Sequence, residues 1–294
     1  MENANMVSGY KGTKNKKCRI CGMEGEFPYY EVKEMYYGTG EVFGYFECLN
    51  CHCMQIEEIP ENLGSYYPDN YYSYEEHEIS EFPPVDAVKG HTRVLDVGCG
   101  SGMWLIERAQ EGYGRLWGCD PFIAEDINYR NRIMIRKCTI HDMTGEYDII
   151  SLNDSFEHMS DPLEVLISIK KLLDTKGMCL INIPVYPNIA QKILGTNWYQ
   201  WDAPRHLFLH SRQSMEYLCK QAGLEIKQVE YNSNAGQFVI SHCYEIGIPM
   251  KDVLRGVGAD RFTEEDMEEL ERLTAEANAG GNGDHAMFLI GHSS

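Results

Sequence analysis

The stretch Val94-Leu95-Asp96-Val97-Gly98-Cys99-Gly100-Ser101-Gly102 decides the fold. An apolar run with one acidic residue leads into three alternating glycines, and an amphipathic segment follows them. Glycine adopts positive φ without steric cost and lets the backbone approach a bound molecule closely. A buried strand, a glycine turn and a helix in this order predict the first unit of a sheet in which strands and helices alternate.

The rest of the chain continues this alternation. Short apolar runs predict strands at Arg93 to Val97, Arg115 to Cys119, Arg132 to Arg136, Tyr147 to Leu152, Met178 to Ile183, Leu224 to Tyr231 and Ala286 to Ile290. Helical patterns predict helices at Met103 to Gln110, Pro162 to Leu173, Ser211 to Ala222 and Arg261 to Ala277. The expected fold class is α/β: a Rossmann-like, mostly parallel seven-stranded sheet with helices on both faces.

An acidic residue ends the second predicted strand. Asp120 lies about 20 residues after the glycines, where a carboxylate can bind ribose hydroxyls. Dinucleotide sites usually show G-x-G-x-x-G, whereas this sequence has D-x-G-x-G-x-G with Asp96 at the strand end. The pattern therefore predicts a nucleoside-containing cofactor and departs from the dinucleotide form.

This pattern resembles that of the class I S-adenosylmethionine (SAM)-dependent methyltransferases. Residues 147–162 (YDIISLNDSFEHMSDP) resemble the fourth-strand signature of that family, and Lys176-Gly177 stands at its turn before the fifth strand. Asn182-Ile183-Pro184 is similar to the end of its fifth strand. The resemblance covers roughly residues 90–230 and implies SAM as the cofactor.

The resemblance also implies individual cofactor contacts. Gly98 and Gly100 are expected near the methionine part of SAM, and Asn153 near its sulfonium. Asp142 stands where the family presents an acid or amide to adenine, although its neighbour His141 is equally consistent with an exposed turn. The implied cofactor-binding residues are Asp96, Gly98, Gly100, Gly102, Asp120, Asp142 and Asn153. Glu157 and His158 are expected to pack and cap the following helix.

Two cysteine pairs precede this region. The knuckles Cys18-x-x-Cys21 and Cys48-x-x-Cys51 are 26 residues apart, and four thiolates at this spacing suit tetrahedral Zn²⁺. Four cysteines close the coordination sphere, so the site is expected to be structural. His52 or Cys53 could replace a ligand, although the spacing favours Cys48 and Cys51.

The sequence predicts four segments. They are a disordered tail (1–13), a zinc-ribbon-like module (14–60), a tyrosine-rich connector (61–89) and a methyltransferase domain (90–294) with an insertion at about 236–281. This layout resembles a bacterial methyltransferase group found with sugar and polysaccharide biosynthesis, including the sugar C-methyltransferases. The resemblance implies a carbohydrate-related acceptor. Many members carry a further large C-terminal domain, which weakens the case for C-methylation here.

The segment Asn197 to Ser211 follows the fifth predicted strand. Ligands of open α/β sheets bind beyond the carboxyl ends of the strands, so this segment is expected to overhang the methyl donor. His206 could act as a general base, or it could bond a backbone carbonyl and fix the loop. Candidate acceptor-binding residues are Tyr71, Tyr72, Trp198, Trp201 and Arg205, although both tryptophans could equally be core.

Charge and composition reduce the number of functions that the chain can have. The 294 residues carry a formal net charge of -19, which disfavours nucleic acid as a partner. The sequence has no apolar run of membrane-spanning length and no secretory signal, so a cytoplasmic protein is expected. The leading function is methyl transfer to a small polar acceptor. The alternatives are an RNA or protein methyltransferase and a non-enzymatic SAM-binding scaffold, while the oligomeric state is left open.

Overall fold

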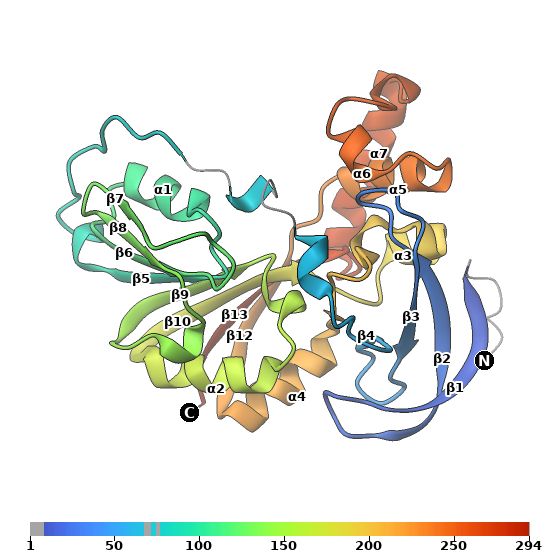
Figure 1. Ribbon diagram of the computed structural model, residues 1–294, viewed down its shortest axis with the longest axis horizontal. Helices are drawn as coiled ribbons and strands as arrows, with labels where there is room; N and C mark the ends of the chain where they lie inside the picture. The colour runs from blue at the N-terminus through green and yellow to red at the C-terminus, as the bar shows by residue number, and fades with distance from the viewer. Residues whose placement is uncertain (1–8, 68–71, 75–76, 294) are drawn as a thin grey trace. The chain divides into compact units, whose positions relative to one another are not determined.

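The computed structural model describes residues 9–67, 72–74 and 77–293 (Figure 1). The chain divides into two units. The first comprises Met1–Tyr66, Pro184–Tyr217 and Glu230–Ala286, and the second comprises Tyr67–Ile183, Leu218–Val229 and Met287–Ser294. Each unit therefore gathers segments that are far apart in the sequence.

An eight-stranded sheet dominates the second unit, in the order β12-β13-β10-β9-β5-β6-β8-β7. Its strands are β5 (Arg93–Val97), β6 (Arg115–Cys119), β7 (Ile127–Tyr129), β8 (Ile133–Arg136), β9 (Tyr147–Asn153), β10 (Leu173–Pro184), β12 (Leu224–Tyr231) and β13 (His285–His292). All seven predicted strands are present. The fold is the expected α/β, Rossmann-like one.

The sheet corrects the prediction in two respects. It has an eighth strand, β7, which pairs antiparallel with β8, so the sheet is mixed. The pairs β10–β9, β9–β5, β5–β6 and β6–β8 are parallel, as expected. β7 is only three residues long and lies at the sheet edge, and so short a strand has no period for a sequence pattern to reveal. The turn expected at Lys176-Gly177 is a register irregularity inside β10.

Helices cover both faces of this sheet. Figure 1 shows α1 (Met103–Gln110) and α2 (Pro162–Leu172) on opposite faces. Leu105, Ile106 and Ala109 of α1 are buried against Val94 and Ile133 of the sheet. This packing holds the start of α1, and therefore the glycine turn before it, in a fixed position.

The first unit contains a second sheet, in the order β1-β2-β3-β4-β11. Its strands are β1 (Tyr10–Lys17), β2 (Glu24–Lys33), β3 (Val42–Glu47), β4 (Met54–Ile56) and β11 (Phe208–Leu209), and each neighbouring pair is antiparallel. β1 begins at Tyr10, so residues 10–13 are strand and not part of a disordered tail.

The cysteine-bearing segment does not have a core of its own. Tyr45 and Phe46 of β3 are buried in the same unit as Trp198, Trp201 and Phe208, which come from the segment between β10 and α4. Tyr45 and Trp201 are in edge-to-face contact at 5.4 Å. Large aromatic side chains from distant segments thus complete one core. The prediction of a separate module that ends at residue 60 is therefore replaced by a unit that also contains residues 184–217 and 230–286.

The predicted insertion is helical. It contains α5 (Gly236–Glu245), α6 (Met250–Val253) and α7 (Glu264–Ala279). α7 begins three residues later than predicted, because Thr263 forms a capping box with Asp266. The remaining helices are α3 (Ile189–Leu194) and α4 (Arg212–Ala222). Among the described residues, no helix has both the length and the apolar character needed to cross a membrane.

Candidate functional site

The glycine turn after β5 has a backbone that only glycine fits. Gly98 has φ +71°, and a Cβ there would lie 2.6 Å from Cβ of Ser155. Gly100 has φ +52°, and its Cβ would lie 2.2 Å from the carbonyl oxygen of Ser73. Gly102, the residue before α1, has φ +91°. The turn is therefore tightly enclosed by other parts of the second unit.

The amide groups of this turn are already hydrogen-bonded within the protein. The acceptors are Cys119 O for Gly98 N and Cys99 N, Asp120 Oδ2 for Gly100 N, Ser73 O for Ser101 N and Cys99 O for Gly102 N. These bonds join the turn to β6, to Asp120 and to the connector.

Two buried carboxylates flank the turn at the ends of neighbouring strands. Asp96 of β5 accepts from Ser151 Oγ at 2.7 Å and from Asn153 Nδ2 at 3.3 Å. Burial raises the pKa of Asp96 to about 7, an effect that these two hydrogen bonds oppose and the charge of Asp120 reinforces. Burial also raises the pKa of Asp120. A ligand that carries positive charge, as SAM does, would offset the cost of ionising both groups.

The structure brings most of the predicted cofactor residues together. Asp96, Asp120 and Asn153 lie at the carboxyl ends of the adjacent strands β5, β6 and β9. Asp142 is used differently: its exposed Oδ2 accepts from Oγ1 of Thr139 at 2.7 Å in a capping box, and this bond lowers its pKa. Its neighbour His141 lies 2.9 Å from Ser168 Oγ. A contact between Asp142 and adenine stays a prediction.

The connector holds the glycine turn, which the sequence did not indicate. Ser101 donates its amide to Ser73 O at 2.8 Å, and its hydroxyl lies 3.2 Å from His77 Nε2. Tyr129 Oη donates to the carbonyl of Ser101 at 3.0 Å. Tyr71 lies outside the described residues, and the side chain of Tyr72 is likewise not described. Their predicted acceptor contacts therefore stay predictions.

An aromatic pair lies at the same end of the sheet. The rings of Tyr67 and Phe122 stack with centroids 5.9 Å apart, and Tyr67 Oη lies 3.0 Å from Nδ1 of His158. Phe122, two residues after Asp120, is 63% exposed. His158 thus bonds the connector in addition to preceding α2. The position of Phe122 two residues after Asp120, which is predicted to bind the ribose, is the signal from which this pair could have been predicted.

The four predicted metal-ligating cysteines lie together. Cys18 and Cys51 have sulfurs 3.6 Å apart, as have Cys21 and Cys48, and all four sulfurs lie within 4.8 Å of one another. Tetrahedral Zn²⁺ with Zn–S bonds of about 2.3 Å would place its sulfurs about 3.8 Å apart. The donor set and spacing therefore fit zinc, while Cys53 lies outside this group.

The two knuckles have the same backbone turn. In each, the first cysteine donates its amide to the residue five positions later, Met23 O or Cys53 O. The first cysteine also accepts from the residue four positions later, Gly22 N or His52 N. These two residues share a positive φ, +75° for Gly22 and +53° for His52. His52 is thus a turn residue, with Nδ1 3.2 Å from Glu47 Oε1.

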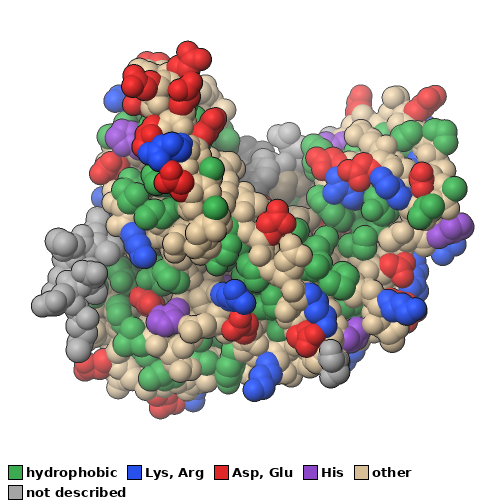
Figure 2. All heavy atoms as spheres, turned by 180° about the vertical axis from the view of Figure 1, so that it is seen from behind, with side chains coloured by type: hydrophobic (Ala, Val, Ile, Leu, Met, Phe, Trp, Pro, Cys, Tyr) green, Lys and Arg blue, Asp and Glu red, His purple; other side chains and the backbone are tan. Residues whose placement is uncertain are grey.

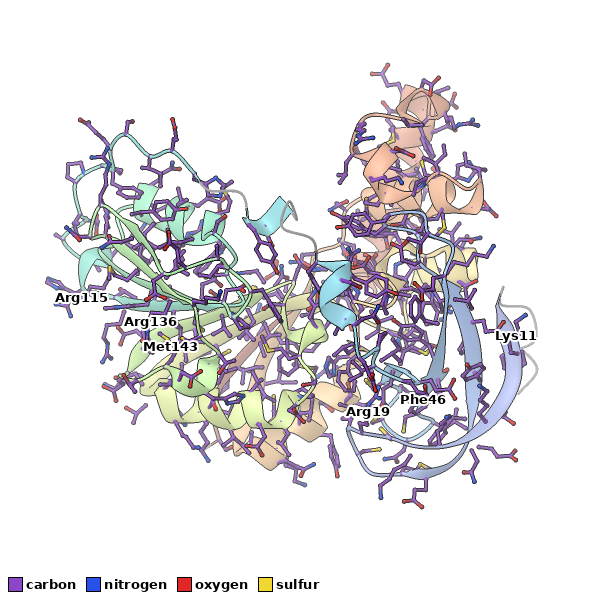
Figure 3. The ribbon with its side chains drawn as sticks, in the orientation of Figure 1. Lys11, Arg19, Phe46, Arg115, Arg136 and Met143 are labelled. Carbon is purple, nitrogen blue, oxygen red and sulfur yellow. The ribbon has the colours of Figure 1, made fainter. Side chains whose placement is uncertain are left out.

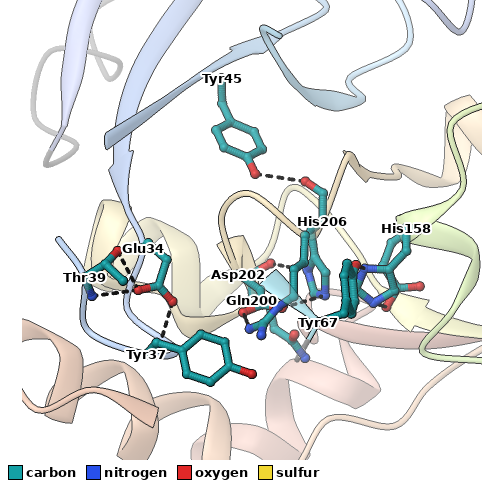
Figure 4. Close-up of polar contacts among 11 residues, drawn as sticks. Glu34, Tyr37, Thr39, Tyr45, Tyr67, His158, Gln200, Asp202 and His206 are labelled. Carbon is teal, nitrogen blue, oxygen red and sulfur yellow. Dashed lines mark hydrogen bonds and ion pairs between the residues drawn. The ribbon is translucent and has the colours of Figure 1, made fainter. Parts of the chain in front are cut away.

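His206 is buried in the first unit, on the segment before β11 (Figure 4). Its Nδ1 lies 2.7 Å from the carbonyl oxygen of Gln200, and Nε2 lies 3.6 Å from Oδ2 of Asp202. A carbonyl can only accept, so Nδ1 carries the proton in the neutral ring and Nε2 is the basic nitrogen. The backbone contact expected of a loop-fixing histidine therefore also orients the ring as a base requires.

The other predicted acceptor residues of this segment are enclosed. Trp198 and Trp201 are 0% and 1% exposed, and their indole N–H groups donate to Asp284 Oδ2 and Gly195 O. The structure therefore corrects the acceptor-binding prediction in favour of the core alternative for both. Arg205 is 1% exposed, bonds Asp202 and lies with its guanidinium 3.8 Å from the ring centroid of Tyr36.

Charge on the insertion is acidic. The first turn of α7 contains Glu264, Glu265 and Asp266. Their negative charges interact favourably with the positive end of the helix dipole. Figure 2 shows acidic side chains gathered over this part of the molecule. Such a surface repels a phosphate backbone, in line with the charge of the whole chain.

A closed glycine turn, two buried carboxylates and an asparagine at the carboxyl edge of a Rossmann-like sheet define the class of SAM-dependent methyltransferases. A family model described as methyltransferase domain matches residues 70–229. The chain belongs to this family.

Individual proteins are similar to parts of this chain. The ubiquinone biosynthesis O-methyltransferase of Haemophilus ducreyi is 27% identical over 161 residues, which cover 47% of this chain and 67% of that protein. Among solved structures, mitomycin 7-O-methyltransferase matches with TM-score 0.42 and 11% identity over 71% of this chain and 51% of the other, so about half of that protein is spanned. A cyclopropane synthase of Mycobacterium tuberculosis matches with TM-score 0.44 and 13% identity over 69% of this chain and 79% of that protein.

Proposed function

We propose that this SAM-dependent methyltransferase acts on a small polar acceptor and uses His206 as the general base. The observation that carries the proposal is the orientation of the His206 ring, whose Nδ1 is held by Gln200 O so that Nε2 is the basic nitrogen. A neutral imidazole has a pKa suited to removing a proton from a hydroxyl or amine near neutral pH.

Each group then has a defined part in the reaction. When bound, SAM supplies an electrophilic methyl group. Asp120 would hold the ribose. The negative charges of ionised Asp96 and Asp120 would attract the positively charged SAM. Attack of the acceptor on that methyl carbon would break its bond to sulfur, the bonding electrons would stay with sulfur, and the proton of the acceptor would pass to Nε2 of His206. The two carboxylates would then attract the product less strongly, because its thioether carries no positive charge.

The acceptor is proposed to be carbohydrate-related: a sugar, a nucleotide-sugar or a polysaccharide precursor. This part rests on the resemblance of the cysteine knuckles and tyrosine-rich connector to methyltransferases of sugar biosynthesis. The match to the ubiquinone O-methyltransferase makes a small-molecule acceptor of another kind an alternative. The 161 aligned residues cover 47% of this chain, so the match does not define the acceptor. An RNA or protein acceptor is disfavoured by the net charge of -19.

Cys18, Cys21, Cys48 and Cys51 are proposed to hold a structural Zn²⁺. Four thiolates leave no open coordination position for an acceptor or water, so the metal would stabilise the first unit and take no part in methyl transfer.

Two measurements test the proposed function. Calorimetry with SAM should show binding to wild type, His206→Ala and His206→Gln with equal affinity within about twofold. Methyl transfer from labelled SAM to a panel of nucleotide-sugars, sugars and quinone precursors should fall by about 10²-fold or more in both variants. Equal turnover in the variants would remove His206 from the chemistry. Transfer to a quinone precursor and to no sugar would overturn the carbohydrate assignment, and SAM binding without any transfer would favour the scaffold alternative.

A further inference from the structure

Residues 206–211, which begin at the proposed base, contact β3, β4 and the second cysteine knuckle at almost every position. β11 pairs with β4, and contacts before and after β11 extend this pairing. The contacts are Tyr45 Oη to His206 O at 2.9 Å, Ile56 N to Leu207 O at 3.0 Å, the pairs Phe208 with Gln55 and Leu209 with Met54, and Ser211 Oγ to Cys51 O at 2.5 Å. β11 itself is only two residues long, so its position depends on these neighbours.

Gln55 joins this pairing to the cysteine cluster. Its side chain is fully buried, its Nε2 donates to the sulfur of Cys18 at 2.9 Å, and its Oε1 accepts from the amide of Arg19 at 2.9 Å. The carbonyl and amino ends of the group are therefore both used, and a flipped amide would satisfy neither partner. The backbone of Gln55 meanwhile pairs with Phe208 on one side and Phe46 on the other.

Arg19, labelled in Figure 3, strengthens the same junction. Its guanidinium donates to the carbonyl of Ile56 at 2.5 Å and lies 5.1 Å from the ring centroid of Phe208. The first knuckle therefore contacts β4 and β11 through two adjacent residues, Cys18 and Arg19. Tyr217 Oη adds a longer contact of 3.4 Å to Cys21 O.

We infer that Gln55 is a positioning residue that couples metal occupancy of the four cysteines to the order of the His206 segment. A metal bound by the four cysteines would fix the position of the Cys18 sulfur, which accepts from Gln55 Nε2, whereas without a metal the four side chains can move independently. Loss of the metal therefore weakens the Gln55 contact, loosens β4 and releases the short strand β11. The inference deepens the proposed function, since it concerns the segment of the proposed base, but the coupling exists whether or not His206 takes a proton.

Hydrogen exchange of the full chain tests this coupling without any methyl transfer. Exchange of the Ile56 and Leu209 amides is measured in zinc-loaded protein and after removal of zinc by a chelator under reducing conditions. Zinc removal should accelerate their exchange by about tenfold, the effect of losing a hydrogen bond to a charged acceptor. Exchange in β5 of the second unit and the affinity for SAM should change by less than about twofold.

Gln55→Leu identifies the residue that carries the coupling. In this variant the zinc-loaded segment should already exchange faster, and zinc removal should add less than about a threefold change. Gln237→Leu is the matched control, because Gln237 is also a buried glutamine of the first unit but bonds Thr274 on α7. It should keep the wild-type response to zinc.

The inference is overturned by any of three results. The first is unchanged exchange at Ile56 and Leu209 on zinc removal, and the second is the same zinc response in Gln55→Leu as in wild type. The third is failure of the wild-type chain to bind Zn²⁺ or Co²⁺ at all. If Gln55→Leu does not fold, Ser211→Ala replaces it, and it should also accelerate exchange of the zinc-loaded segment.

Cobalt gives an independent readout of the same contact. Co²⁺ bound to four thiolates has sulfur-to-metal charge-transfer absorption, and a thiolate that loses a hydrogen-bond donor releases electron density more easily. The charge-transfer band of Gln55→Leu should therefore move to longer wavelength than that of wild type, while that of Gln237→Leu should not move. An unshifted band in Gln55→Leu would show that the contact with Cys18 does not form.

Discussion

At the residue scale, buried Asp96 makes stability depend on pH in a predictable direction. Its pKa is raised from 3.8 to about 7 by burial, so the ionised form is costly in the folded protein. Ionisation of Asp96 therefore does not lower the free energy of unfolding below about pH 4. The loss of unfolding free energy grows as pH rises from about 4 to 7, and it reaches its full size above about pH 7. A shift of this size corresponds to at most about 4 kcal/mol.

Asp96→Asn removes the ionisable group and should therefore remove this cost. The melting temperature of the cofactor-free variant, relative to wild type, should rise between pH 5 and pH 8 because only wild type becomes less stable through ionisation. A difference between Asp96→Asn and wild type that is independent of pH would contradict the prediction.

The two knuckles provide a second prediction at this scale, because one has glycine and the other histidine at the corresponding position, where φ is positive in both. Gly22→Ala places a Cβ where there is open space, so its cost should come from the backbone alone, about 1 kcal/mol of unfolding free energy. His52→Gly should be neutral or stabilising by up to about 1 kcal/mol, since it relieves the same strain and loses only a partly exposed contact with Glu47.

Urea unfolding of the zinc-loaded protein, followed by tryptophan fluorescence, measures both changes. Met23→Ala, next to Gly22 and 42% exposed, is a control for a substitution in the turn without positive φ. Destabilisation by His52→Gly as large as that by Gly22→Ala would mean that the imidazole contributes more than the backbone strain removes.

At the element scale, the connector should contribute to cofactor binding because it holds the glycine turn. His77 contacts Ser101 Oγ, and Ser73 accepts from Ser101 N. His77→Ala should weaken SAM binding by about three- to tenfold, through loss of one hydrogen bond that orders the turn. Calorimetry measures the effect, and His91→Ala, at an exposed histidine after the connector, should leave the affinity unchanged. Wild-type affinity in His77→Ala would show that the turn is ordered without the connector.

The elements themselves were largely predictable, and the differences have local causes. α1 and β6 have the predicted limits because a glycine with positive φ lies next to each. Gly102 precedes α1, and Gly112 lies in the turn between α1 and β6. α7 begins at the Thr263 cap and not at Arg261, since the hydrophobic pattern alone places a helix start only approximately. β7 and β11 were missed because strands of two or three residues are stabilised by their partners and have no pattern of their own.

At the scale of the whole molecule, the charge predicts which acceptors are unsuitable. With a net charge of -19, the chain should not retain RNA at physiological ionic strength. A gel-shift titration with single-stranded and duplex RNA, in the presence of SAM, checks this. Binding that weakens steeply as salt rises would support the RNA methyltransferase alternative and contradict the small-molecule assignment.

The sequence by itself determined the α/β sheet, the methyltransferase family and the four cysteines that are proposed to bind a metal. Each of these depends on short-range patterns: a period of apolar residues, glycines at fixed spacing, and paired cysteines in a turn. The tertiary structure decided that the cysteine strands share a core with the segment of Trp198 and His206, that the connector holds Ser101, and that Gln55 contacts Cys18. Those contacts join residues that are far apart along the chain, and they depend on shape complementarity in a packed core, which no local pattern encodes.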